Sequence, residues 1–198
     1  MPTPEKTSRL LMRNIVGGQA DADRPHNEAL AILDTITSAY VLSRGLNTPP
    51  VAAEGDTYII GCNTFGHLAA GLFELNRIGD DTSGNDWQRT RTMGVNTLAF
   101  RGIQHGAFYA ADPDCVGLTQ KIAWGKNKQW MELVAGSGTP LFISAQPEAV
   151  GAEQKETIKE CFASASKELP VGEPLDWMDS PIPRKWRLGN TVELFDWD

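Results

Sequence analysis

The chain has 198 residues, of which 41% are hydrophobic and 22% charged, an ordinary balance for a globular protein with a real core. Its formal net charge of −7 argues against a general nucleic-acid binder, because phosphate contacts need clustered Lys and Arg. No apolar stretch is long enough to span a bilayer, and the first residues contain no apolar signal-peptide core. We therefore expect no nucleic-acid partner and no membrane partner.

The cysteines and histidines are too scattered to predict a disulfide framework or a zinc site. Cys62, Cys115 and Cys161 are odd in number and widely spaced, which favours free thiols. The three histidines stand alone along the chain. Gly17-Gly18 and Gly136-Ser137-Gly138 lack the spacing and the Lys of a phosphate-binding loop. We expect neither a metal nor a cofactor.

Helical periodicity and short apolar runs alternate along the chain and set the expected fold class. The predicted helices are 28–44, 86–103, 127–135 and 153–167, and the predicted strands are 56–62, the segment ending at Arg77, 107–111 and 140–145. Alternating short buried strands and helices predict a parallel α/β sheet. About four such units would be half of a (β/α)8 TIM barrel, and four strands are too few to close one.

The sequence pattern changes after residue 169, where prolines and tryptophans become frequent. Four prolines alternate with Trp177, Met178 and Trp186, and Thr191 to Phe195 alternates like a strand. We therefore predict a partial catalytic barrel over residues 1–169. Residues 170–198 are predicted to be a linker and the start of a C-terminal β segment.

Three successive strand ends carry polar groups. The central one is Arg77-Ile78-Gly79-Asp80-Asp81-Thr82, with Trp87 shortly after it. Gly61-Cys62-Asn63 precedes it and Asp112-Pro113-Asp114-Cys115 follows it. Because parallel strands deliver their C-terminal ends to one edge, this pattern is typical of a binding or catalytic site.

Each of these motifs also has a plain structural explanation. Adjacent Asp80 and Asp81 after Arg77 could be a loop with a surface ion pair, and Asp112-Pro113-Asp114 could be a simple turn. A functional role for the aspartates requires one carboxyl group to hold a proton near neutral pH, which burial promotes and an arginine opposes. Cys62 is disfavoured as a nucleophile, because His67 follows it with no third member to orient it.

In these three motifs the sequence resembles the melibiase-type α-galactosidases, a family of retaining glycoside hydrolases built on a (β/α)8 barrel. Gly61-Cys62-Asn63 resembles the family's Gly-Cys-Gly strand end, and Arg77 to Asp81 resembles its Arg-x-x-x-Asp element. Asp112-Pro113-Asp114-Cys115 resembles its Asp-Pro-Asp-Cys motif. The three motifs occur in the family's order over about residues 55–118.

The resemblance implies a role for each matched residue. Asp81 would be the general acid/base of a two-carboxylate mechanism on an α-galactoside or related oligosaccharide. Arg77 would contact the substrate and Cys62 would line the sugar pocket, with Asp80 and Trp87 as further substrate-binding residues. Asp112 and Asp114 would have a structural role, holding the substrate-binding residues in place without contacting the substrate.

The sequence departs from the family at the nucleophile. A Lys-x-Asp strand end would fall at about Ser8 to Leu11, where Arg9 stands and no carboxylate is present. The chain therefore resembles the second half of a barrel cut at both ends, and we expect little hydrolysis from it alone. The alternatives are a non-catalytic carbohydrate-binding protein, a remnant, or a half-barrel completed by self-association or by a partner.

Overall fold

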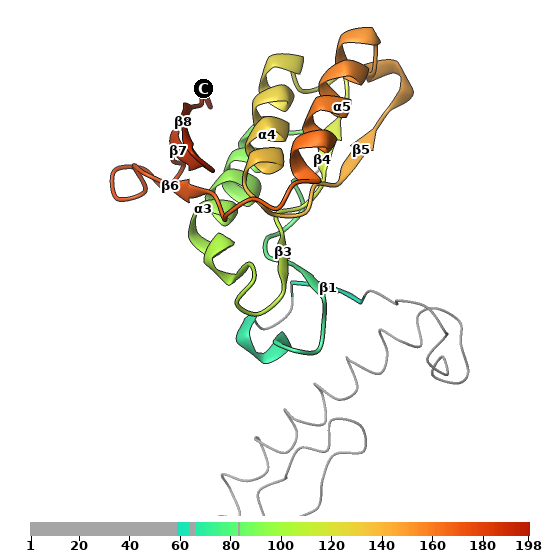
Figure 1. Cartoon of the computed structure of the whole chain (residues 1–198). Helices are drawn as coiled ribbons and strands as arrows, with labels where there is room; N and C mark the ends of the chain where they lie inside the picture. Colours follow the sequence, from blue (N-terminus) through green and yellow to red (C-terminus); the bar gives the residue numbers. More distant parts are fainter. Residues whose placement is uncertain (1–58, 64–65, 83) are drawn as a thin grey trace, which may run out of the picture. The chain divides into compact units, whose positions relative to one another are not determined.

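The computed structural model describes residues 59–63, 66–82 and 84–198. This part of the chain has a mixed α/β fold with small parallel and antiparallel sheets (Figure 1). The expected mixed class with parallel strands is therefore confirmed, while the strands described do not form a closed barrel. No helix among the described residues is long and apolar enough to cross a membrane. The predicted helix at 28–44 lies outside the described residues.

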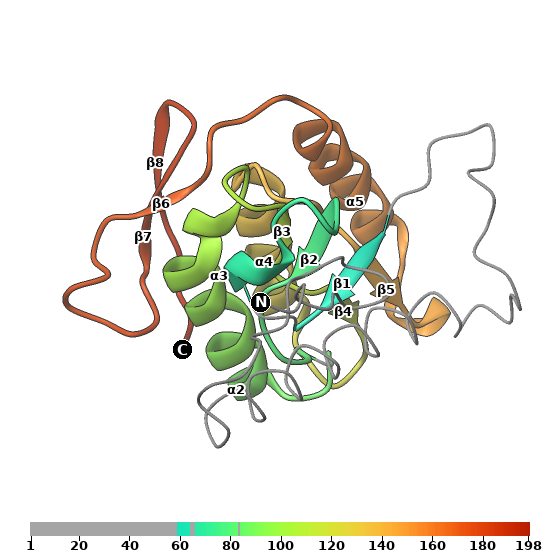
Figure 2. The same cartoon turned by 90° about the horizontal axis from the view of Figure 1, so that it is seen from below.

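Three short parallel strands form the first sheet. They are β1 (Ile60–Cys62), β2 (Leu75–Arg77) and β3 (Ala110–Asp112), in that spatial order (Figure 2). The 3-10 helix η1 (Gly66–Ala69) connects the first two strands. The register pairs Cys62 with Arg77 and Arg77 with Asp112, so the polar ends of all three strands lie in one row.

A second parallel pair continues from the first sheet. β4 (Val116–Leu118) follows β3 after only three residues and pairs with β5 (Ile143–Ala145). The break between β3 and β4 contains Asp114 in the left-handed conformation, with φ of 81°. The chain thus pairs with β2 before the break and with β5 after it.

A long helical segment follows β2 and is interrupted by a π turn. It consists of α2 (Trp87–Arg89), η2 (Thr90–Val95), α3 (Asn96–Arg101) and the 3-10 turn η3 (Gly102–Gln104). Asp86 caps its start by accepting a hydrogen bond of 2.9 Å from the Gln88 amide. The helix passes so close to the end of β2 that a Cβ on Gly79 would lie 2.7 Å from the Met93 carbonyl oxygen. Glycine at this position allows the close contact.

Two further helices, mainly the first of them, contribute to the larger core. α4 (Trp124–Gly136) and α5 (Ala152–Ala165) lie side by side (Figure 1), and the short turn η4 (Pro147–Ala149) precedes α5. α4 buries several large apolar side chains, among them Trp130, Met131 and Leu133. These pack with Val116 and Leu118 of β4, so the core lies between α4 and this strand.

The C-terminal residues form a small antiparallel sheet. β6 (Glu173–Pro174) pairs with β7 (Lys185–Leu188), which pairs with β8 (Thr191–Leu194) across a two-residue turn at Gly189–Asn190. The predicted strand at 191–195 is therefore confirmed. The division into domains at residue 169 stays a prediction.

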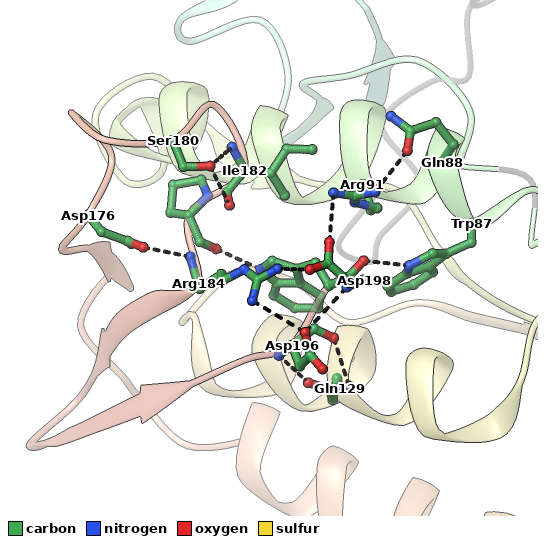
Figure 3. Close-up of polar contacts among 12 residues, drawn as sticks. Trp87, Gln88, Arg91, Gln129, Asp176, Ser180, Ile182, Arg184, Asp196 and Asp198 are labelled. Carbon is green, nitrogen blue, oxygen red and sulfur yellow. Dashed lines mark hydrogen bonds and ion pairs between the residues drawn. The ribbon is translucent and has the colours of Figure 1, made fainter.

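After β8 the chain crosses back over α4 and α2 (Figure 3). Trp197 is fully buried, stacks on Phe195 at 5.0 Å between ring centroids, and donates its indole N–H to the Pro183 carbonyl at 2.7 Å. Around it, Arg184 pairs with Asp196 and Asp198. We call residues 183–198, with these contacts, the C-terminal clamp.

Candidate functional site

The predicted site residues Cys62, Arg77 and Asp112 end neighbouring strands in the same register. Side chains in one register row of a parallel sheet point to the same face. The expectation that three successive strands bring polar groups to one edge is therefore confirmed for the backbone. The contacts of each side chain decide which of them share a site.

Arg77 is the centre of the polar contacts at this edge. Its Nη1 lies 2.7 Å from Asp81 Oδ1 and 3.4 Å from Asp114 Oδ1. Burial lowers the pKa of Arg77, but electrostatic interactions with Cys62, Asp114 and Asp81 outweigh burial and leave the pKa raised. The guanidinium is thus a fixed cation that holds two carboxylates from different loops.

Asp114 ties the loop after β2 to the break after β3. Its Oδ2 accepts hydrogen bonds from the Thr82 amide at 2.6 Å and from the Thr82 hydroxyl at 2.9 Å. The side chain is only 9% exposed, and the residue adopts the left-handed conformation that Asp tolerates better than most residues. Thr82 also donates to the Cys115 carbonyl at 3.0 Å. These contacts give Asp114 a structural role, because its carboxylate is already bound and is not available to react with a ligand.

Asp112 is a buried carboxyl group behind Asp114. It is 7% exposed and accepts a hydrogen bond of 2.9 Å from the Asp114 amide. Burial raises its pKa to about 6, helped by the charge of Asp114 and opposed by the amide bond and by Arg77. Asp112 therefore changes its protonation near neutral pH inside the protein.

The two adjacent aspartates of the central motif have different surroundings. Asp80 accepts a hydrogen bond of 2.8 Å from the Asp81 amide and pairs with Arg89 at 2.8 Å. The amide bond, followed by the charge of Arg89, lowers the pKa of Asp80. Asp81 instead pairs with Arg77 and keeps 60% of its side chain exposed. Of the two, Asp81 is the carboxylate that faces the cleft described next.

A polar cleft opens at the strand ends. Asp81, Arg77 and Asp114 line one part of it, and the other lining residues come from the loop before α2 and from the ends of β4 and β5. These other residues are Asn85, Cys115, Gly117, Leu118, Thr119, Ser144, Ala145 and Gln146. We call this the strand-end cleft. Next to Asn85, the loop before α2 passes close to β4 at Gly84, where φ is +66° and a Cβ would lie 2.6 Å from the Gly117 carbonyl oxygen.

Sequence reasoning missed the polar groups on the second wall of the cleft. Thr119, Ser144 and Gln146 line it beside Asp81. Thr119 and Gln146 each follow directly after a strand, and Ser144 lies within β5. The rule that singled out Arg77 applies to Thr119 and Gln146. Thr119 was missed because Gly117 interrupts the short apolar run of β4, whereas Gln146 was missed although it follows a predicted strand.

Besides Asp80 and Asp112, two further predicted site residues, Trp87 and Cys62, do not line this cleft. Trp87 donates its indole N–H to the Trp197 carbonyl at 2.8 Å, and its ring lies 6.1 Å from that of Trp197, with Lys126 over its face. Trp87 therefore packs against the C-terminal clamp. Cys62 is exposed at the end of β1 and is not among the residues that line the cleft.

The half-buried thiol in the cleft is not activated for nucleophilic attack. Burial raises the pKa of Cys115 to about 11, and the negative charges of Asp114 and Asp112 act in the same direction. Within the described ranges, no group of three His, Cys, Asp or Glu side chains could hold a metal ion.

Comparison with known families changes the expected relationship of this chain. Residues 26–89 match the model of a family described as "Protein of unknown function (DUF2793)". This match covers the stretch from Arg77 to Trp87 that carried most of the resemblance to the α-galactosidases, and no glycoside hydrolase family matches. The expected membership of the melibiase-type family is therefore wrong. A search of curated proteins finds no match.

The error has a physical cause. The Arg77–Asp81 pair is four residues apart, and the Asp112-Pro113-Asp114 turn uses residue types that many loops share. An arginine that binds aspartates at parallel strand ends is a solution available to unrelated chains. Motif likeness at strand ends therefore did not establish descent.

Proposed function

We propose that the strand-end cleft binds a polyhydroxylated ligand of the carbohydrate class. The observation that carries this proposal is the mixture of side chains around the exposed Asp81. A carboxylate accepts hydrogen bonds, Arg77 donates them, and hydroxyl and amide groups do both. Sugar hydroxyls need such alternating donors and acceptors. Few of the lining side chains are apolar, so the contacts open to a ligand are mainly hydrogen bonds.

The ion pair between Arg77 and Asp81 supports binding in particular. Nη1 of Arg77 already orients Asp81 Oδ1 at 2.7 Å, so little side-chain freedom remains to be lost when a ligand hydroxyl donates to this carboxylate. Asp114 fixes Arg77 from the other side at 3.4 Å. The polar groups are thus held in place before a ligand arrives.

For the architecture, we propose that β1 to β5 with their helices are half of a (β/α)8 barrel, and that β6 to β8 begin a C-terminal β segment. Support comes from the parallel register of β1, β2 and β3 and from the alternation of strands and helices. A cleft at the C-terminal ends of the strands is where such barrels bind their ligands.

Hydrolysis of a glycosidic bond is the second candidate function. The exposed position of Asp81 at the cleft favours it, because this carboxylate can reach a ligand bound there. A retaining mechanism requires a second carboxylate about 5–5.5 Å from the first. Asp114 binds Thr82 and Arg77 and is not free to attack, so the described residues supply one half of the mechanism.

Isothermal titration calorimetry with galactose and with raffinose tests the binding proposal. We expect a measurable heat with at least one sugar, lost in Asp81→Asn and kept in the control Asp179→Asn, whose exposed carboxylate lies outside the cleft. No heat with either sugar contradicts carbohydrate binding.

Turnover of an aryl α-galactoside separates binding from hydrolysis. We expect turnover near background with the isolated chain. Release of the aryl alcohol that persists through purification and disappears in Asp81→Asn would establish hydrolysis instead.

A further inference from the structure

We propose that two copies of this chain associate through the free edges of their parallel strands, β5 of each copy beside β1 of the other. The proposal rests on the half-barrel proposed above, and its test is independent of ligand binding. Within the described residues, β1 is the end of one parallel sheet and β5 the end of the other. Among these residues, each therefore has one edge with no strand beside it.

The hydrogen-bonding direction of each edge follows from the printed pairings. The Leu75 amide donates to the Ile59 carbonyl and the Asn63 amide to the Arg77 carbonyl, so residues 59, 61 and 63 face β2. Because successive residues of a strand point their amides to opposite sides, Ile60 and Cys62 direct theirs away from β2.

The same argument applies to β5. The Val116 amide donates to the Phe142 carbonyl, and the Gln146 amide donates to the Leu118 carbonyl. Residues 142, 144 and 146 therefore face β4. Ile143 and Ala145 direct their amides and carbonyls to the outer edge, where a further parallel strand would pair.

Exposed apolar side chains lie at both edges. Ile60 on β1 is 38% exposed, and Phe142, directly before β5, is 37% exposed. Parallel sheets are normally covered on both faces and their edges protected, since an open edge invites pairing with another chain. Neither edge carries the lysine, proline or inward charge that natural proteins use to block pairing.

The number of strands points to a second copy as the occupant. β3 and β4 are separated by three residues, so β1, β2, β3–β4 and β5 fill four strand positions. Eight positions close a (β/α)8 barrel, so two copies related by a two-fold axis supply the required number. Because all strands of such a barrel run the same way, the strand-end clefts of both copies would open on one face.

Light scattering on the full chain after size-exclusion chromatography tests the association. We expect a mass of twice 21.6 kDa that falls to that of the monomer on dilution. A monomer throughout the dilution series overturns the proposal, including the case in which other residues of the same chain cover these edges.

Edge substitutions identify the surface. Ile60→Pro and Ala145→Pro each remove an outward amide without removing a bond to β2 or β4, so each is expected to give a monomer with unchanged circular dichroism. The matched control is Leu194→Lys on the edge strand β8, where the side chain is 78% exposed, and it should remain dimeric. The proposal is overturned if both proline variants remain dimeric, or if Leu194→Lys becomes monomeric.

Discussion

The strand-end cleft and the C-terminal clamp both contain an arginine that binds two aspartates, but in opposite surroundings. In the cleft, Arg77 binds Asp81 and the buried Asp114. In the clamp, Arg184 binds Asp196 and Asp198, whose side chains are 74% and 67% exposed. The ion pairs of the clamp therefore lie in water, while one carboxylate of the cleft lies inside the protein.

This difference determines where the stability of each region comes from. Exposed ion pairs contribute little, because solvent screens them and ordering two long side chains is costly. Removing either a buried carboxylate or the groups that bind it leaves buried polar groups without a partner, which is costly. In the clamp we therefore assign the stability to the buried indoles, and in the cleft to the hydrogen bonds of Asp114.

Trp197→Ala is expected to have the largest effect. The indole is fully buried, stacked on Phe195 and bonded to the Pro183 carbonyl. Removing a buried aromatic side chain costs about 3–5 kcal/mol in the free energy of unfolding. Urea unfolding followed by tryptophan fluorescence measures it, with Trp177→Ala as control, since Trp177 is 49% exposed. Equal losses in the two variants would contradict this assignment.

Asp114→Ala is expected to cost about 3 kcal/mol, because it leaves the Thr82 amide without its acceptor and places alanine in a left-handed conformation, while the Thr82 hydroxyl keeps the Cys115 carbonyl. Asp114→Asn removes only the charge, since Asn tolerates the left-handed conformation and keeps an acceptor oxygen. It therefore separates the effect of the charge from that of the backbone conformation. Urea unfolding should rank wild type above Asp114→Asn and Asp114→Asn above Asp114→Ala. If Asp114→Ala is as stable as wild type, the structural role assigned to Asp114 is wrong.

Asp112→Asn is expected to change how stability depends on pH. Its pKa is raised in the folded state to about 6 from the ordinary 3.8, so the native protein binds a proton in this window that the unfolded chain does not. The free energy of unfolding contributed by Asp112 therefore rises as pH falls through 6 and is lost as pH rises through 6.

The asparagine variant lacks this ionisation. Relative to wild type, it should gain about 2 kcal/mol on going from pH 4.5 to pH 7.5, because it avoids burying a charge at the higher pH. Urea unfolding of both proteins across this range measures the difference. A constant difference between the two curves would mean that Asp112 titrates like an exposed carboxyl group.

Arg184→Ala is expected to have the smallest effect. Its guanidinium is exposed and binds two exposed carboxylates, so the urea midpoint should shift only slightly and the shift should vanish in 1 M salt. A loss as large as that of Trp197→Ala would place the stability of the clamp in its ion pairs, contrary to our account.

Much of the secondary structure could be predicted from the sequence. The helices at 86–103, 127–135 and 153–167 were predicted close to their observed positions, because their apolar residues recur at helical spacing. The π turn at Thr90–Val95 was not foreseen, since periodicity does not report a local change in hydrogen bonding. The strand predicted at 107–111 begins only at Ala110, after a turn closed by the Gly106 amide bonded to the Tyr109 carbonyl.

Three strands, β4, β6 and β7, were not predicted, and the reasons differ for β4 and β7. β4 follows a proline and contains Gly117, so its apolar run is too short to stand out. β7 alternates Lys185, Trp186, Arg187 and Leu188, and the Gly189–Asn190 turn after it is a recognisable hairpin signal. The surrounding prolines obscured that pattern.

The composition of the site depended on contacts between distant segments. The sequence predicted that Arg77, Asp81 and Asp114 belong together, because each follows a buried strand. It did not reveal that Trp87 packs on Trp197, which lies 110 residues later. Local spacing reports which residues end a strand, whereas side-chain partners depend on the tertiary arrangement.

The most direct test of the central claim is an NMR titration of the labelled full chain with galactose and with raffinose. If the strand-end cleft binds carbohydrate, the amide signals of Asp81, Asn85, Thr119 and Gln146 should shift together with sugar concentration, and those of the C-terminal clamp should stay in place. Asp81→Asn should abolish the shifts. Saturating shifts at other residues only, or none with either sugar, would contradict the account.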